Sequence, residues 1–123
     1  MMYPGFNTEK LAESKAFYTQ HFGFEVIFED SWFVLLKRGD YELGFMQPGL
    51  PQQNPLFQPA FGGGSWLAFE TDDAHREYER LQQAGVPIVA EIKDESWGDR
   101  HFVVKDPNGI GVDIYQRIEV AAS

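Results

Sequence analysis

The chain has 123 residues, of which 43% are hydrophobic and 15% aromatic, which is enough for one ordinary globular domain. Nineteen acidic against ten basic residues give a formal net charge of −9, which repels nucleic acid phosphates and anionic membranes and favours a neutral or cationic partner. The sequence contains no cysteine, which excludes disulfides, thiolate metal ligands and cysteine nucleophiles.

The sequence leads us to expect no targeting or membrane-spanning segment. Residues 1–5 lack a basic stretch followed by an apolar one, and no apolar run approaches the length of a membrane span. We therefore expect a cytoplasmic protein that binds neither membranes nor nucleic acid.

Residues 1–47 carry the signals of a βαβββ unit, which we call module 1. Thr8 is a good N-cap for a helix over residues 9–22, and Gly23 follows as a helix terminator. Alternating apolar residues after Gly23 predict a strand, and the turn at Arg38-Gly39-Asp40 predicts a hairpin. The expected strands are a short one through Phe6 and three more at residues 24–28, 32–37 and 41–46.

Residues 48–64 are rich in proline and end in Gly62-Gly63-Gly64, so we expect a linker. The triple glycine lacks the Lys and Ser or Thr of a phosphate-binding loop, which favours a crossover between modules. Residues 65–118 then repeat the order of module 1 and form module 2. Its expected elements are a strand at 65–69, a helix at 73–84, and strands at 88–92, 101–105 and 111–116.

The two modules also match in sequence, which indicates one duplicated supersecondary unit, since two copies are too few for a solenoid. Half of the chain would form only a marginal core alone, so the modules are expected to share a core or to pair with modules of a second subunit. The clearest matches are Phe6-Asn7-Thr8-Glu9 with Phe69-Glu70-Thr71-Asp72, Asp30-Ser31-Trp32 with Glu95-Ser96-Trp97, and Leu43-Gly44-Phe45-Met46-Gln47 with Val112-Asp113-Ile114-Tyr115-Gln116.

Two charged positions of module 2 have structural interpretations. Asp106-Pro107-Asn108-Gly109 places each residue where a turn prefers it, so the acid of this turn is expected to be structural rather than catalytic. Arg100 is expected to form an ion pair or to bind a carbonyl that fixes the preceding loop.

Four motifs stand out beside the two modules. They are Ser14-Lys15-Ala16-Phe17-Tyr18 before His21-Phe22-Gly23-Phe24, and Trp97-Gly98-Asp99-Arg100-His101-Phe102 before Asp106-Pro107-Asn108-Gly109. With these motifs and its two modules, the chain resembles the vicinal oxygen chelate superfamily, which includes glyoxalase I, extradiol dioxygenases and bleomycin resistance proteins. The resemblance implies an α+β fold in which two tandem βαβββ modules form glyoxalase-like half-barrels, paired in a homodimer.

In the enzymes of that superfamily, His, Gln or Glu side chains on the first and last strands of each module hold a divalent metal. The resemblance and the internal repeat place these positions at Tyr3, Gly44, Trp66 and Asp113. Only Asp113 is a good ligand, and a lone carboxylate does not hold a divalent ion against water. We therefore expect no cofactor, no metal ligand set and no catalytic residue.

A shifted metal site remains an alternative. His101, Glu42 and Asp113 have suitable ligand types, although no spacing supports the set. The sequence favours another interpretation of His101, as a strand residue that is hydrogen-bonded at the sheet surface.

Aromatic residues around the four positions suggest a binding pocket instead. Flat apolar walls with one carboxylate suit a planar ligand with a positive group, although a strand aromatic is more often a core residue. This pattern is similar to that of the bleomycin resistance branch, whose members are acidic, metal-free dimers that sequester a cationic antibiotic. The expected ligand-binding residues are Tyr3, Trp32, Phe45, Trp66, Trp97, Asp113 and Tyr115.

The sequence thus favours a small-molecule binding protein that sequesters an aromatic or cationic compound. A metal-dependent lyase, isomerase or dioxygenase with non-standard ligands is the alternative. A purely structural or partner-binding module, with its cavity filled by its own side chains, is a third possibility.

Overall fold

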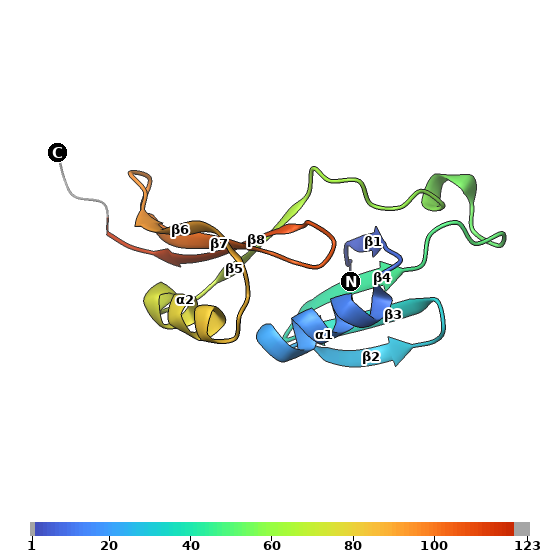
Figure 1. The fold of residues 1–123 in the computed structure, drawn as a ribbon, viewed down its shortest axis with the longest axis horizontal. Helices are drawn as coiled ribbons and strands as arrows, with labels where there is room; N and C mark the ends of the chain where they lie inside the picture. The colour runs from blue at the N-terminus through green and yellow to red at the C-terminus, as the bar shows by residue number, and fades with distance from the viewer. Residues whose placement is uncertain (1, 120–123) are drawn as a thin grey trace. The chain divides into compact units, whose positions relative to one another are not determined.

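The computed structural model describes residues 2–119. The chain divides into two compact units, residues 1–63 and residues 64–123, and the division falls within the glycine triplet (Figure 1). In the described residues each unit has one α-helix and one four-stranded sheet, which confirms the α+β fold with two tandem modules. Both α-helices are too short to cross a lipid bilayer.

Module 1 places its strands in the order β1-β4-β3-β2. β1 runs parallel to β4, and the remaining neighbours are antiparallel. This order follows from the sequence, because β2, β3 and β4 are joined by short turns while α1 separates β1 from them. The elements are β1 (Gly5–Asn7), α1 (Leu11–His21), β2 (Glu25–Glu29), β3 (Phe33–Arg38) and β4 (Tyr41–Met46).

The helix of module 1 begins two residues later than the capping pattern predicts. The hydroxyl of Thr8 accepts a hydrogen bond from the backbone N–H of Lys10 at 2.9 Å, so residues 8–10 form a turn before α1. The end of the helix is as expected, because Gly23 has a left-handed φ of 70°.

The core of module 1 lies between α1 and one face of its sheet. Tyr18 on α1 is fully buried, and its ring stacks on Phe45 of β4 with centroids 5.5 Å apart. Val34 and Leu36 on β3 are also buried, whereas their neighbours on that strand are only partly so. The alternation means that the other face of this sheet, which we call open face 1, points away from α1.

Residues 57–61 of the linker contact β1 of module 1. The side-chain amide of Asn7 donates hydrogen bonds to the carbonyls of Phe57 and Pro59. The backbone N–H of Phe61 donates to the carbonyl of Asn7 at 2.8 Å, and its ring meets Phe6 edge-on at 5.3 Å. A short 3₁₀-helix, η1 (Pro55–Phe57), lies within this segment.

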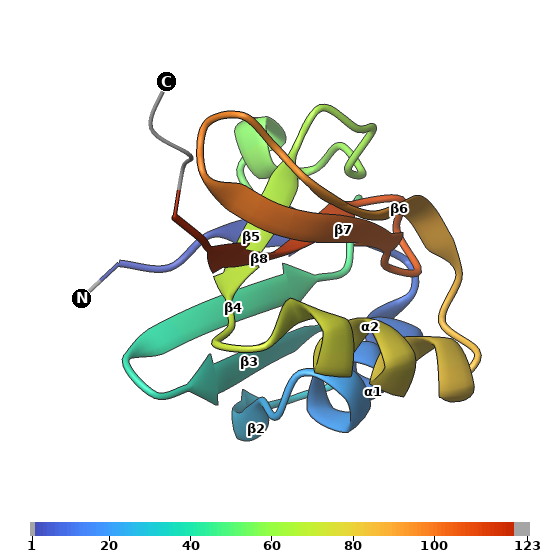
Figure 2. The same ribbon diagram turned by 90° about the vertical axis from the view of Figure 1, so that its left-hand side faces the viewer.

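Module 2 repeats the topology with the strand order β5-β8-β7-β6. α2 lies along one face of this sheet and contacts β6, β7 and β8 (Figure 2). The ring of Tyr78 on α2 packs 5.0 Å from that of Phe102 on β7. The elements are β5 (Trp66–Glu70), α2 (Ala74–Gln83), β6 (Ile88–Asp94), β7 (Asp99–Lys105) and β8 (Gly111–Arg117).

The hydrogen bonds of the two modules repeat as the sequences do. The backbone N–H of Thr8 donates to the carbonyl of Met46 at 2.7 Å, and that of Thr71 donates to the carbonyl of Tyr115 at 2.8 Å. In each module the threonine hydroxyl then accepts from the backbone N–H two residues further on. The same pair of threonine hydrogen bonds therefore forms the turn between the first strand and the helix of each module.

The two charged positions of module 2 have the structural roles that the sequence predicts. Asp106 is buried, and its Oδ1 accepts hydrogen bonds from the backbone N–H groups of Asn108 at 2.8 Å and Ile110 at 2.9 Å. Arg100 binds Asp94 across β6 and β7 through Nε at 2.7 Å and Nη2 at 3.1 Å. This pairing raises the pKa of Arg100 and lowers that of Asp94.

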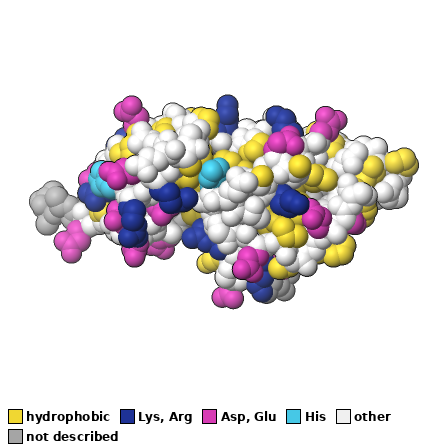
Figure 3. Space-filling view, turned by 60° about the horizontal axis from the view of Figure 1, so that its bottom comes forward, with side chains coloured by type: hydrophobic (Ala, Val, Ile, Leu, Met, Phe, Trp, Pro, Cys, Tyr) yellow, Lys and Arg dark blue, Asp and Glu magenta, His cyan; other side chains and the backbone are white. Residues whose placement is uncertain are grey.

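The surface carries charges of both signs despite the net charge of −9. On the face shown in Figure 3, acidic and basic side chains are interspersed, and hydrophobic side chains reach the surface between them.

Candidate functional site

Tyr3 and Gly44 come together on open face 1. Gly44 pairs with Gly5 in the parallel β1–β4 register. A Cβ atom added to Gly44 would lie 2.9 Å from Cε2 of Tyr3 and 3.3 Å from Cε2 of Phe33. The absence of a side chain at position 44 therefore makes room for the tyrosine ring, which remains 41% exposed.

Aromatic side chains lie near Gly44 on open face 1, whereas Lys37 and Glu42 lie further along the same face of the β3–β4 hairpin. Phe33 on β3 lies on this face, because its sequence neighbour Val34 is buried against α1. Phe28 on the edge strand β2 pairs with Leu35, and its exposed ring lies 6.0 Å from that of Phe33. Trp32, one of the predicted ligand-binding residues, lies beside Phe33 with ring centroids 6.0 Å apart.

Phe45 requires a correction. It was predicted to contact a ligand, but its side chain is fully buried against Tyr18 in the core of module 1. Successive strand residues point to opposite faces, so a residue next to Gly44 faces the helix when Gly44 faces away from it. Phe45 is a core residue.

Module 2 places three predicted residues on the sheet face that points away from α2, which we call open face 2. Val112 and Ile114 of β8 are buried on the helix side, so Asp113 and Tyr115 lie on the open side. Trp66 is on this face as well, because Ala68, two residues further along β5, pairs with Asp113. The indole of Trp66 is 73% exposed. The guanidinium of Arg117 lies 5.4 Å from the centre of the Tyr115 ring.

His101 lies between two carboxylates on open face 2. Its Nδ1 is 2.8 Å from Oδ1 of Asp113, and its Nε2 is 3.4 Å from Oε1 of Glu95. The ammonium of Lys93 lies 2.8 Å from the same oxygen of Glu95. Sequence reasoning brought His101 and Asp113 to one face but did not identify Glu95 or Lys93.

These contacts shift the acid–base equilibria of the cluster. Burial disfavours the charged form of His101, but the hydrogen bonds with Asp113 and Glu95 outweigh it and raise its pKa. The hydrogen bond from Lys93, followed by that from His101, lowers the pKa of Glu95 against the opposing effect of desolvation. The structure therefore stabilises the charged forms of both side chains.

Trp97 stands at the edge of this cluster, in the turn between β6 and β7. Its Nε1 donates to Oδ2 of Asp99 at 2.9 Å, which fixes the ring, and its indole is 65% exposed. The centroid of the indole lies 6.3 Å from that of the His101 ring. An exposed, oriented indole beside charged groups suits the stacking of a flat ligand.

The four positions at which the resemblance implies a metal do not offer a suitable donor set. They supply a phenol, a glycine, an indole and the carboxylate of Asp113, which is already hydrogen-bonded to His101. Of the shifted set, His101 and Asp113 are bound to each other, and Glu42 lies on β4 of module 1. Across residues 2–119, no three His, Asp or Glu side chains are grouped as metal ligands.

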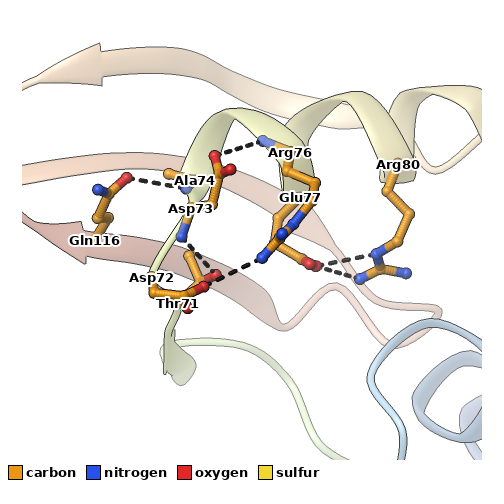
Figure 4. Close-up of polar contacts among 8 residues, drawn as sticks. All are labelled: Thr71, Asp72, Asp73, Ala74, Arg76, Glu77, Arg80 and Gln116. Carbon is orange, nitrogen blue, oxygen red and sulfur yellow. Dashed lines mark hydrogen bonds and ion pairs between the residues drawn. The ribbon is translucent and has the colours of Figure 1, made fainter.

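A depression of about 520 Å³ on module 2 lies where α2 begins and is a structural junction. Figure 4 shows Gln116 reaching from β8 to the backbone N–H of Ala74, which donates to its Oε1 at 3.0 Å. Asp73 caps the helix by accepting from the N–H of Arg76 at 3.1 Å. Since these helix-start N–H groups are satisfied within the module, the depression does not present them to an anion. Its walls are Glu70, Thr71, Asp72, Gln116 and Arg117.

Two tandem βαβββ modules, each with a helix on one face of a mixed sheet and an open face opposite, define a glyoxalase-like fold. The model of the Glyoxalase/Bleomycin resistance protein/Dioxygenase superfamily matches residues 3–114, and the chain belongs to this family. The resemblance seen in the sequence motifs is thereby confirmed.

Individual relatives have different activities. The chain is 27% identical to a bleomycin resistance protein of Klebsiella pneumoniae over 107 residues, which cover 79% of this chain and 77% of the relative. Its fold is similar to that of lactoylglutathione lyase from Agrobacterium tumefaciens, with a TM-score of 0.78, 21% identity, and coverage of 94% and 92% of the two chains. It is also similar to TnmS3, an antibiotic binding protein from Streptomyces sp. CB03234, with a TM-score of 0.73, 23% identity, and coverage of 94% and 93%.

Proposed function

We propose that this chain is a small-molecule binding protein that sequesters an aromatic or cationic compound, such as an antibiotic, without a catalytic metal. In this proposal the protein is a cytoplasmic homodimer and the compound lies in an aromatic-lined cavity. One observation carries the proposal: three of the four positions at which the family's enzymes bind a metal hold aromatic rings or a glycine. Tyr3 contacts Gly44 on open face 1, and Trp66 is exposed on β5 beside β8 on open face 2.

The physical basis of this proposal is that exposed aromatic rings gain free energy when a ligand removes them from water. Trp66 and Trp97 each present most of an indole to solvent, and large exposed aromatics commonly mark sites where a ligand or partner binds. A rigid ring gives a large contact area at a small entropic cost, because few torsions are frozen when it binds. The bleomycin resistance and antibiotic binding relatives agree with a ligand of this kind.

The test is isothermal titration calorimetry with bleomycin and a panel of planar aromatic cations, in buffer containing EDTA. We expect saturable binding to at least one compound, and at least about fivefold weaker affinity in Trp66→Ala, since buried aromatic anchors dominate binding energy. Tyr41→Ala is the matched control, because Tyr41 is an equally exposed aromatic on the strand face that carries Leu43 and Phe45. Its affinity should equal that of the wild type.

A titration with metal ions distinguishes this proposal from a metalloenzyme. The protein is titrated with Ni²⁺, Mn²⁺, Zn²⁺ and Fe²⁺ under the same conditions without EDTA. A single tight stoichiometric site that Asp113→Ala abolishes would show the proposal to be wrong, as would the absence of binding to every compound in the panel. A homodimer is checked by light scattering coupled to size-exclusion chromatography.

A further inference from the structure

Residues 43–69 form a segment without any charged side chain. No Asp, Glu, Lys or Arg occurs between Glu42 and Glu70, although charged residues make up 24% of the chain and give it a net charge of −9. The linker lies at the centre of this segment. It is therefore a neutral part of an otherwise acidic protein.

Side-chain amides organise the first part of the linker from within. Oε1 of Gln53 accepts a hydrogen bond from the backbone N–H of Leu50 at 3.0 Å, and its Nε2 donates to the carbonyl of Gln47 at 2.6 Å. Nε2 of Gln58 donates to the carbonyls of Leu50 at 3.2 Å and Gln53 at 3.0 Å. The backbone N–H of Gly49 donates to the carbonyl of Gln58 at 2.8 Å, which closes the loop at its base. Compact loops of this kind, with close ends and their own side chains inside, are frequently functional.

The same loop exposes two large apolar side chains, which we call the linker tip. Leu56 and Phe57 lie on η1, the green coil at the right of Figure 1, and are 79% and 55% exposed. Asn54 caps η1 by accepting from the backbone N–H of Leu56 at 2.9 Å, and Asn7 of β1 donates to the carbonyl of Phe57. Polar side chains thus fix the backbone of the loop while apolar ones stand in solvent. Adjacent exposed apolar residues on an ordered loop indicate a contact surface.

The charge of the protein indicates which partner fits the linker tip. Two copies that each carry −9 repel one another, and this repulsion is least where neither surface bears a charge. A twofold contact brings the same patch of both copies together, so it buries Leu56 and Phe57 against their own counterparts and buries no charge. Segments that bind membrane surfaces usually add Lys or Arg to their apolar residues, and this segment has neither.

We propose that the linker tip meets the same tip of a second copy across a twofold axis and anchors a homodimer. This inference rests on the homodimer of the proposed function and identifies the surface through which it forms. The tip belongs to the compact unit of residues 1–63, so its own geometry does not depend on the position of module 2. A stable interface covers about 800 Å² per partner, so Leu56 and Phe57 are its anchor residues and not its whole area.

The absence of cysteine from the chain allows a direct test of this contact by disulfide cross-linking. Leu56→Cys introduces a single thiol at the linker tip, and Tyr41→Cys is the matched control at an exposed position of β4 in the same module. We expect copper phenanthroline to link Leu56→Cys into a dimer at least about tenfold faster than Tyr41→Cys, because thiols held together by a twofold contact react at a high effective concentration. Equal rates for the two variants would overturn the inference.

A second test measures the dissociation constant of the dimer by analytical ultracentrifugation. Leu56→Ser and Phe57→Ser should each raise it by at least about tenfold, as the loss of an anchor residue does, whereas Tyr41→Ser should leave it unchanged. Thermal unfolding of each variant shows that it is folded. A monomeric wild type, or a dissociation constant that neither tip substitution raises, would contradict the proposed contact.

Two further measurements separate this inference from its alternatives. If the wild type sediments with phosphatidylcholine vesicles and Phe57→Ser does not, the tip binds a lipid surface and the inference is overturned. Calorimetry with the compound panel of the proposed function is run on the wild type and on Phe57→Ser. If the wild type dimerises through the tip but binds no compound, the ligand-binding proposal fails and this inference stands. If compounds bind and the dimer survives both tip substitutions, this inference fails and the ligand-binding proposal stands.

Discussion

Asp106 secures the turn between β7 and β8, and replacing it with alanine should destabilise module 2 strongly. Its Oδ1 accepts two backbone hydrogen bonds, and the Ile110 residue that donates one of them is fully buried. Hydrogen bonds to a charged acceptor contribute about 1.5 to 3 kcal/mol each, and a buried donor left without a partner carries a penalty of similar size. Because the two bonds share one oxygen, we expect Asp106→Ala to lower the free energy of unfolding by about 3 kcal/mol.

Another turn aspartate, in module 1, supplies the control for this prediction. Asp30 in module 1 also accepts two backbone hydrogen bonds, from Trp32 at 2.9 Å and Phe33 at 2.8 Å, but it is exposed. Water can replace its carboxylate, so Asp30→Ala should cost only about 1 kcal/mol.

The assay is urea unfolding followed by tryptophan fluorescence. With a slope of about 1.5 kcal/mol per molar urea, the midpoint should fall by about 2 M in Asp106→Ala and by less than about 1 M in Asp30→Ala. Asp106→Asn keeps the accepting oxygen and should lose about half as much as the alanine variant. Equal losses at positions 106 and 30 would refute the reasoning, as would loss of ligand binding in a stably folded Asp106→Asn.

The remaining predictions concern the core and the two open faces. The raised pKa of His101 means that its contacts stabilise the fold fully below the unfolded value of about 6.5 and that this stability is lost as pH rises through the folded value. His101→Gln should therefore cost more unfolding free energy at pH 6 than at pH 9 in urea titrations, and the reverse order would contradict the assigned contacts. Gly44→Ala should cost less than about 1.5 kcal/mol, because the crowded Tyr3 ring is partly exposed and can move, and the cost should vanish in a Tyr3→Ala background when measured as a double-mutant cycle. Phe45→Ala should lower the free energy of unfolding by about 3 to 5 kcal/mol in thermal or urea unfolding, as for other buried phenylalanines. A decrease below about 1 kcal/mol would contradict the assignment of Phe45 to the core.

Much of the fold could be predicted because the residues that end its helices and define its strands are local sequence signals. Gly23 and Gly85 both adopt left-handed φ angles at the ends of the two helices, a conformation that glycine tolerates and other residues avoid. Alternation of apolar residues then placed the strands to within a few positions. The packing of the linker could not be predicted, because it depends on Asn7 bonding to residues some fifty positions away.

The candidate site was only partly accessible to sequence reasoning. The resemblance and the alignment of the repeats placed Tyr3, Gly44 and Asp113 at candidate site positions, and the structure brings Tyr3 to Gly44 and puts Asp113 on open face 2. Glu95 was missed because the repeat makes it equivalent to Asp30, and an acid at that position is explained by a turn. The longer glutamate side chain instead reaches His101 on the neighbouring strand, a difference of one methylene that no spacing rule reveals.

The parallel pairing of β1 with β4 has a consequence for folding order. β2, β3 and β4 follow one another through short turns, whereas the pairing of β1 with β4 closes a loop that contains α1, β2 and β3. Closing such a loop is entropically costly, and β1 contributes only three residues in return. We therefore expect its amide protons to be among the first of the module 1 sheet to exchange with deuterium in the native state. Tyr3 lies two residues before this strand, so slower exchange at Phe6 and Asn7 would report a compound that binds to its ring.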